Sequence, residues 1–216
     1  MYLPKEFAED RIPVLHDAMR AIAFGTLVTT GAGGLAASHI PLLLDAEPAP
    51  YGMLTGHLAR GNPQGRGSQS RGVPAEGVEA LAIFLGPHAY VSPSWYPSKH
   101  ENGKVVPTWN YVAIHAHGTL RFIDDLDWKI AHVTRLTASQ ETRRASPWAV
   151  SDAPPDYITG MAKGITGFAL PIAQLYGKWK MSQNRLPADS AGAAEGLSRE
   201  GNAAVAAIVI DRNVAN

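Results

Sequence analysis

The stretch His88–Ile123 constrains the fold most, because it ends in a long run of strand-type sequence, TWNYVAIHAHGTLRFI. Side chains along a strand point alternately to opposite faces. The even positions, from Asn110 to Leu120, are mostly apolar, whereas the odd positions, from Trp109 to Arg121, mix aromatic and polar side chains. This alternation predicts a strand with one core face. The other face suits a partner subunit or a planar ligand better than open water.

The rest of the chain predicts an α+β fold built around an antiparallel β-barrel. The segment AYVSPSWY before the long run alternates like a strand and breaks at Pro97, and the polar loop SKHENGK follows. Prolines are expected to mark an edge or bulge at Pro41 and a break at Pro171. The first three strands should form a meander. Further strands are expected at 24–30, 35–45, 51–59, 78–87 and 166–183, with helices at 9–22, 125–144, 154–165, 187–198 and 202–213.

Bulk composition predicts one cytoplasmic domain. At 216 residues the chain suits a barrel domain over 1–186 with a helical C-terminal extension over 187–216 packed on it. The 19 basic and 19 acidic residues balance, so no overall field favours nucleic acid or an anionic membrane. The absence of cysteine excludes disulfides and thiolate sites. No signal-peptide pattern or membrane-length apolar run is visible.

Patterns for metal or nucleophilic chemistry are weak. His115 and His117 share a strand face and could chelate a metal, but no third ligand is indicated, and histidines hydrogen-bonded at an interface are favoured. Ser92, Ser94 and Ser98 lie near histidines without the GxSxG motif of a serine hydrolase. The glycines at 31–34 lie between two strands, which predicts a turn and not a dinucleotide-binding loop.

Two strand ends combine basic and amide side chains. GHLARGN places His57, Arg60 and Asn62 where glycines let a ligand approach the backbone, and a guanidinium binds phosphate with two hydrogen bonds. GKWKMSQNR, at 177–185, is a second such end that also contains tryptophan. Together with the aromatic strand face, these ends could hold a phosphate and a flat ring, as in a flavin nucleotide. The alternative is a solvated arginine at an ordinary strand end.

Seven segments spread over the chain resemble the PaiB family, whose members are described as FMN-binding negative transcriptional regulators. They are MYLPKEF, SHIP, GHLARGNPQ, AYVSPSWYPSK, GKVVPTWNY, PWAVSDAP and GKWKMSQN. The resemblance implies the split β-barrel of pyridoxamine-phosphate-oxidase-like flavoproteins. It also implies a homodimer that binds FMN at the subunit interface.

By position in the matching motifs, the resemblance assigns nine residues to the cofactor. Arg60 and neighbouring donors would hold the phosphate, while the two tryptophans would flank or shield the ring. One departure is the segment 65–77, which replaces the short turn that usually follows HLARxNPQ and affects the contacts expected there. The assigned residues are His39, His57, Arg60, Asn62, Trp109, Lys178, Trp179, Gln183 and Asn184.

The resemblance leaves the activity open between a regulator and an enzyme. A regulator that contacts DNA needs a basic patch, for which Lys129, Arg135, Arg143 and Arg144 are candidates, although a solvated helix face is favoured. Regulation through a partner protein would also fit the family description. A flavin-dependent oxidoreductase is the alternative, because the cofactor itself would carry that chemistry. Haem binding is a third and weaker alternative.

Overall fold

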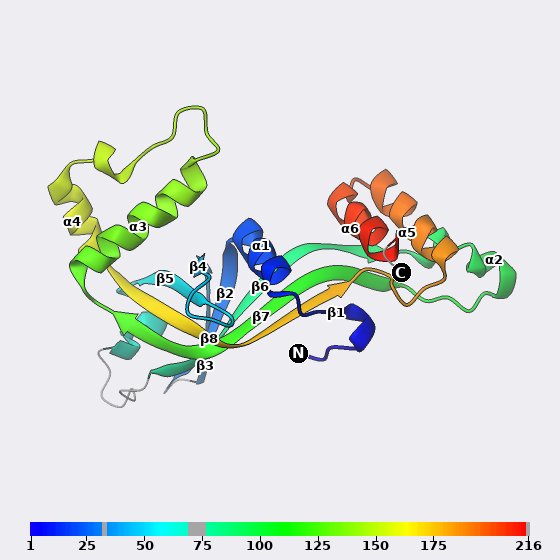
Figure 1. Cartoon of the computed structure of the whole chain (residues 1–216), viewed down its shortest axis with the longest axis horizontal. Coiled ribbons are helices and arrows are strands. Elements are labelled where there is room, and N and C mark those ends of the chain that lie inside the picture. The colour runs from blue at the N-terminus through cyan, green and yellow to red at the C-terminus, as the bar shows by residue number, and fades with distance from the viewer. Residues whose placement is uncertain (32–33, 69–76, 215–216) are drawn as a thin grey trace. The chain divides into compact units, whose positions relative to one another are not determined.

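The computed structural model describes residues 1–31, 34–68 and 77–214. The chain divides into two compact units, each assembled from segments far apart in sequence. We call His16–Phe84 with His115–Leu175 the barrel unit, and Met1–Leu15 with Leu85–Ile114 and Tyr176–Asn216 the terminal unit. Three long strands, β6, β7 and β8, run through both units (Figure 1).

The fold is α+β with an antiparallel sheet, as the sequence predicts. Within the described residues it has eight strands and six α-helices. Seven strands follow one hydrogen-bonded path in the order β3-β2-β6-β7-β8-β5-β4. Their bounds are β2 Phe24–Gly31, β3 Gly34–Pro41, β4 Leu43–Asp45, β5 Met53–Ala59, β6 Val78–Val91, β7 Thr108–Ile123 and β8 Ile165–Lys180.

The predicted meander of the first strands is wrong. β2 pairs with β3 and β4 pairs with β5, but these two hairpins lie at opposite ends of the strand path. The N–H of the buried Leu42 donates to the Ala23 carbonyl at 2.8 Å, which continues the register of β2 and β3 by one pair before the chain enters β4. In the described residues β3 and β4 are the two ends of this path, and the sheet is not closed between them.

The alternation predicted for β7 is confirmed. Val112, Ile114, Ala116 and Leu120 are buried, and Asn110 is fully buried with them. On the odd face most side chains are half-buried or exposed. β7 therefore contributes one face to the core along most of its length.

Pro171 does not break β8, contrary to expectation. Pro171 lies opposite Met53, the first residue of β5, and β8 continues through it to Lys180. The next N–H, that of Ile172, donates to the Gly52 carbonyl at 2.9 Å. Because the N–H groups of neighbouring strand residues point to opposite sides, Pro171 lacks its N–H on the side away from β5, and no hydrogen bond between β5 and β8 is lost.

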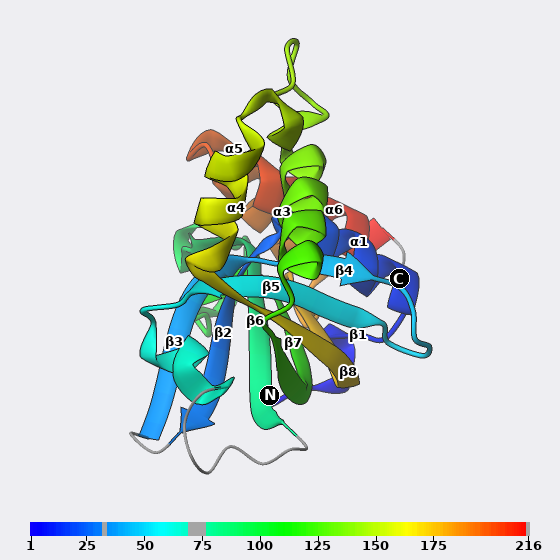
Figure 2. The same ribbon diagram turned by 90° about the vertical axis from the view of Figure 1, so that its left-hand side faces the viewer.

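Two helices of the barrel unit, α3 (Leu126–Glu141) and α4 (Pro155–Lys163), pack side by side (Figure 2). The Asp125 side chain caps α3 by accepting a hydrogen bond from the Trp128 N–H at 2.7 Å. The segment expected as a long loop after β5 begins with a 3-10 helix, Pro63–Ser68. Its remainder at 69–76, like 32–33 of the expected glycine turn, lies outside the described residues.

The terminal unit joins both ends of the chain to the distal parts of the long strands. β6 runs unbroken to Val91 and not only to 87, and the expected loop at 98–104 begins as a helical turn. Gly201 has φ +81° and lies between the last two helices, where the sequence predicts a break between helices at 187–198 and 202–213. No described helix is both long and apolar enough to cross a bilayer. The remaining elements are β1 Ala8–Glu9, α1 Ile12–Ile22, α2 Ser98–Asn102, α5 Pro187–Arg199 and α6 Ala203–Val214, with 3-10 turns at Lys5–Phe7, Pro93–Trp95 and Val150–Asp152.

Candidate functional site

The nine residues predicted to contact a cofactor fall into both units. Four belong to the barrel unit and five to the terminal unit. The barrel-unit residues are His39, His57, Arg60 and Asn62, and the terminal-unit residues are Trp109, Lys178, Trp179, Gln183 and Asn184.

Arg60, the predicted phosphate ligand, holds parts of the barrel unit together. Its Nε donates to the Lys163 carbonyl at 2.8 Å, and its guanidinium pairs with the carboxylate of Asp124. Asp124 also accepts a hydrogen bond from Lys129 Nζ at 2.8 Å. The hydrogen bonds from Arg60 and then Lys129 lower the pKa of Asp124. A phosphate at Arg60 would have to compete with this carboxylate, and the assignment stays a prediction.

His57 packs against a second histidine on α3. Its ring meets that of His132 edge-on, with centroids 5.4 Å apart, and His132 stacks on Trp128 at 5.1 Å. Burial lowers the pKa of His57, and burial followed by the proximity of His57 lowers the pKa of His132 to about 4. The pair is therefore neutral near pH 7, and Nδ1 of each ring has no hydrogen-bond partner.

His39 and Asn62 are tied to neighbouring strands. A 2.9 Å hydrogen bond joins the His39 ring to the Thr26 hydroxyl across β2 and β3. The Asn62 amide donates to Ser38 Oγ at 2.9 Å, and its carbonyl accepts the backbone N–H of Gln64 at 2.9 Å. These bonds bring the turn after β5 against β3, so the Asn62 amide already has a structural role.

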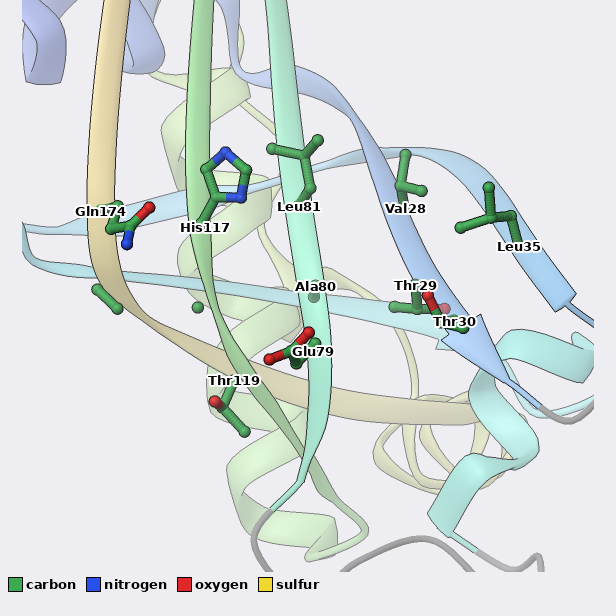
Figure 3. A pocket seen from close by; sticks show the side chains of 12 residues that line it. Val28, Thr29, Thr30, Leu35, Glu79, Ala80, Leu81, His117, Thr119 and Gln174 are labelled. Carbon is green, nitrogen blue, oxygen red and sulfur yellow. The ribbon is translucent and has the colours of Figure 1, made fainter. Parts of the chain in front are cut away.

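The barrel unit contains an open cavity of about 430 Å³. Its wall comes from five strands, and the labelled side chains project from them together in Figure 3. None of the nine predicted residues lines it, although it includes His117 from the odd face of β7. The lining residues are Val28, Thr29, Thr30, Leu35, Glu79, Ala80, Leu81, His117, Gly118, Thr119, Ala173 and Gln174.

An aromatic cluster lies on the terminal-unit part of β6 and β7. Trp109 is 54% exposed, and its ring lies 6.3 Å from that of His88 and 6.2 Å from that of Tyr90. Tyr90 is itself 45% exposed. We call these three residues the aromatic wall. Only Trp109 belongs to the aromatic and polar face that the sequence predicts for β7, whereas His88 and Tyr90 come from β6.

Three predicted residues on and after β8 are engaged within the terminal unit. Lys178 is buried, donates to the Tyr2 carbonyl at 3.0 Å and lies 5.4 Å from the centre of the Tyr111 ring. Trp179 is also buried. Gln183 folds the turn after β8, because its amide donates to the Trp179 carbonyl at 2.6 Å. These three side chains stabilise the end of β8, and the polar groups of Lys178 and Gln183 already have partners within the protein.

Asn184, in contrast, is exposed and lines a small hollow of about 60 Å³ that we call the cationic pocket. Two basic side chains lie in its wall, and neither is among the nine predicted residues. Lys180 Nζ donates to the Trp109 carbonyl at 2.7 Å and also bonds the Thr108 hydroxyl. The sequence did point to this region, since both basic residues of the pocket, Lys180 and Arg185, lie in the segment GKWKMSQNR. The pocket is lined by Thr108, Asn110, Lys180, Ser182, Asn184 and Arg185.

A metal centre finds no support in the described part of the chain. His115 and His117 are neighbours, with ring centroids 6.3 Å apart. Within the described residues, however, no three His, Cys, Asp or Glu side chains are grouped so that they could hold an ion. Burial lowers the pKa of His115.

Comparison with known proteins points to one family. Residues 1–174 match the family described as "Putative FMN-binding domain". An uncharacterized protein of Emericella nidulans is 35% identical over 98% of this chain and 97% of its own. The Bacillus subtilis protein named "Protease synthase and sporulation protein PAI 2" is 35% identical over 94% of this chain and 91% of its own.

Solved structures share the fold at low sequence identity. The FAD and heme binding protein from Mycobacterium smegmatis has a TM-score of 0.56 at 18% identity, over 82% of this chain and 74% of that chain. The flavocytochrome Anf3 from Azotobacter vinelandii has a TM-score of 0.54 at 9% identity, over 84% of this chain and 76% of that chain. At these identities the likeness concerns the fold alone.

Proposed function

The chain belongs to the FMN-binding-domain family, which includes its PaiB-type relatives, and from that premise we propose that it is an FMN-binding regulator whose flavin lies at a homodimer interface. The family match and the relative in Bacillus subtilis confirm the resemblance predicted from the sequence. The observation that carries the proposal is the open cavity on the barrel unit.

The cavity has the size and chemistry that a flavin ring requires. Its volume of about 430 Å³ lies within the range of roughly 300–1,000 Å³ that is usual for small-molecule sites. Val28, Leu35 and Leu81 supply apolar surface, while Thr119 and Gln174 supply groups that can bond the polar edge of the ring. When bound, FMN would supply redox chemistry or a ligand signal, and this chain would bind and orient it.

The phosphate of FMN needs cations that the cavity does not provide. No lysine or arginine lines the cavity, and Glu79 adds a carboxylate. The cations must therefore come from elsewhere in this chain or from the second subunit of the proposed dimer. The nine residues assigned by resemblance are the present candidates for the remaining contacts, with Arg60 on the phosphate and Trp109 beside the ring.

A homodimer would cover the exposed aromatic wall. Exposed apolar patches on a soluble protein often mark interaction sites. Trp109 and Tyr90 are large side chains of the kind enriched at protein interfaces, and both are about half exposed. This exposure supports, for the wall, the interface role inferred from the odd face of β7.

Regulation by direct DNA contact receives little support from α3. Lys129 is buried and paired with Asp124, Arg135 pairs with Asp45, and Arg144 pairs with Glu141. These carboxylates neutralise three of the four cations proposed for a DNA-binding patch. We therefore favour regulation through a partner protein, with a gel shift on promoter DNA at several salt concentrations as the test. Phosphate contacts would give a steep loss of binding as salt increases.

The decisive experiment on the cofactor is an FMN titration followed by absorbance and gel filtration. Wild-type protein should bind FMN at micromolar concentration and retain it on the column. Thr119→Trp should fill part of the cavity and weaken FMN at least tenfold. Thr142→Trp, at an exposed site after α3, is the matched control and should bind as the wild type does.

The outcomes distinguish a loss of folding from a loss of FMN binding. Both variants should keep the wild-type melting temperature, because both positions are exposed. No flavin retention by wild-type protein would contradict the proposed function as a whole. If Thr119→Trp instead binds FMN as tightly as the wild type, the flavin ring does not lie in this cavity.

A second candidate function is a flavin-dependent oxidoreductase, favoured by two cavity residues. His117 and Glu79 are side chains that can transfer protons beside a bound ring. Loaded protein would then transfer two electrons per turnover from a reduced nicotinamide or a similar donor to an added acceptor such as dioxygen or a quinone, over many turnovers. The variant His117→Phe should lose turnover while retaining FMN. Absence of turnover with any such donor would leave the regulator as the function supported.

A further inference from the structure

The cationic pocket of the terminal unit has no role in the assignments above beyond the exposed Asn184. We propose that it is an oxyanion site built for a phosphate group, with Lys180 and Arg185 supplying the charge and Ser182, Thr108 and Asn184 supplying neutral donors. The proposal rests on three independent observations: cations without counterions, a matched set of donors, and a constrained backbone.

The cations have no counterion. Lys178, Lys180 and Arg185 belong to one strand end, and none of the described carboxylates forms an ion pair with any of them. Lys178 is buried, and Lys180 is only partly exposed. Charges removed from water are normally paired, because desolvation is otherwise uncompensated. Burial, followed by the repulsion of Lys178 and Arg185, lowers the pKa of Lys180. A bound anion would offset both the desolvation of these cations and the repulsion between them.

The pocket has the size and donors of an oxyanion site. Its volume of about 60 Å³ exceeds the roughly 10–15 Å³ that one water needs, but it is far smaller than a flavin ring requires. Two hydroxyls and two amides share the wall with the two cations. Phosphate prefers such a mixture of a guanidinium, an ammonium and neutral donors.

The supporting structure holds these groups in place. Ser182 is buried and has φ +64°, an uncommon value for a residue with a side chain. Asn110, also buried, donates to its hydroxyl at 3.0 Å. Lys180 is anchored by the carbonyl of Trp109, and Arg185 lies 5.0 Å from the centre of the Tyr96 ring. Backbone strain of this kind persists where the surroundings impose it, often at ligand sites.

The phosphate could come from two sources, and the chemistry of the pocket is the same for both. It could be the phosphate of FMN, in which case this inference rests on the proposed function. It could equally be free phosphate or a small phosphorylated metabolite that binds independently of flavin.

The test combines calorimetry with two flavins. Inorganic phosphate is titrated into wild-type protein with and without FMN, and the affinities for FMN and for riboflavin, which lacks the phosphate, are measured separately. Lys180→Gln and Arg185→Gln remove the charges, Lys180→Arg restores one, and Lys163→Gln is the control at an exposed lysine of the barrel unit. Melting temperatures establish that each variant is folded.

Two results would support the site and identify its source. If the pocket takes the phosphate of FMN, inorganic phosphate competes with FMN, and Lys180→Gln and Arg185→Gln each weaken FMN at least tenfold without changing riboflavin. If it takes a free anion, phosphate binds equally with and without FMN, and the same two variants abolish that binding. Lys180→Arg should recover most of the affinity, and Lys163→Gln should match the wild type.

One result would overturn the site without affecting the flavin proposal. This would be wild-type protein that binds FMN normally, shows no calorimetric binding of phosphate, and keeps the same preference for FMN over riboflavin in folded Lys180→Gln and Arg185→Gln. Conversely, phosphate binding in a protein that takes up no flavin would support the oxyanion site and contradict the proposed function.

Discussion

The Glu9 carboxylate is buried between two guanidinium groups of the terminal unit. Its Oε2 lies 2.6 Å from Arg11 Nη2 and 2.7 Å from Arg212 Nη1, and its side chain is 2% exposed. The hydrogen bond from Arg11, with further help from Arg212, lowers the pKa of Glu9 to about 2 despite its burial. The charged form is therefore strongly preferred in the folded protein.

This geometry predicts a stability loss on replacement and a defined pH dependence. Glu9→Gln should lower the free energy of unfolding by about 2–3 kcal/mol at pH 7. Because the pKa is lower in the folded state, the stabilisation is complete above the ordinary value of 4.5 and is lost as the pH falls toward about 2. Urea denaturation between pH 7 and pH 3 measures this, with Glu6→Gln as the exposed control. A difference that stays constant with pH would contradict the assignment.

The lowered pKa of His132, in the barrel unit, predicts a second way in which stability depends on pH. Its pKa of about 4 lies below the ordinary value of 6.5, so the unfolded chain takes up a proton between these values that the folded chain does not. Stability should therefore fall by about 2 kcal/mol between pH 7.5 and pH 5. His132→Phe, which can keep the stacking on Trp128, should remove most of that fall in chemical denaturation. An unaltered pH profile would show that another group is responsible.

The family resemblance assigns Arg60 to the phosphate of FMN, and one variant of Arg60 tests that assignment. Its pair with Asp124 is partly exposed, so Arg60→Ala should change stability by less than about 1 kcal/mol. If Arg60 binds the phosphate, the same variant should lose about 1.5–3 kcal/mol of FMN affinity. Fluorescence titration with FMN measures this. Unchanged affinity in a folded variant would assign Arg60 to structure alone.

At the scale of the elements, two helical glycines make opposite predictions. A Cβ on Gly196 of α5 would overlap the indole of Trp95, whereas a Cβ on Gly160 of α4 meets nothing within 4 Å. Gly196→Ala should therefore cost about 1–3 kcal/mol through overpacking. Gly160→Ala should instead stabilise by up to about 1 kcal/mol, because alanine favours helix. Thermal melting of both variants decides, and a stable Gly196→Ala would show that Trp95 moves freely.

Local patterns predicted the elements well and their pairing poorly. β7 was evident because its alternation between Trp109 and Arg121 is a property of neighbouring residues. The meander was wrong because strand pairing depends on contacts far apart in sequence: the second neighbour of β2 is β6, and that of β5 is β8. Pro171 was misjudged for the same reason, since its effect depends on which neighbouring strand its missing N–H would have faced.

At the scale of the whole molecule, the proposed homodimer should depend on the aromatic wall for its interface. Trp109→Arg should place a charge in the proposed interface and shift the protein toward monomer. Trp148→Arg, at another exposed tryptophan, should leave the oligomeric state unchanged. Light scattering during gel filtration measures the mass of each. A wild-type monomer, or a dimer unaffected by Trp109→Arg, would contradict this interface.

The site was harder to predict than the fold, because no single segment contains it. The cavity collects one to three residues from each of five strands, and only His117 stood out in the sequence. Family motifs highlighted Trp179 and Gln183, which are engaged inside the terminal unit. Lys180 and Arg185 were in view but unassigned, since their lack of a counterion is visible only in three dimensions.

The pairing of β5 with β8 sets a limit on how early the protein can fold during its synthesis. Leu54 pairs with Leu170 and Ala59 with Ile165, so β5 must wait for more than a hundred further residues before its partner exists. β1 waits still longer, since Ala8 pairs with Lys178. Contacts so distant in sequence close slowly. Until β8 emerges from the ribosome, β5 can therefore pair with β4 alone, and its other edge stays open in the growing chain.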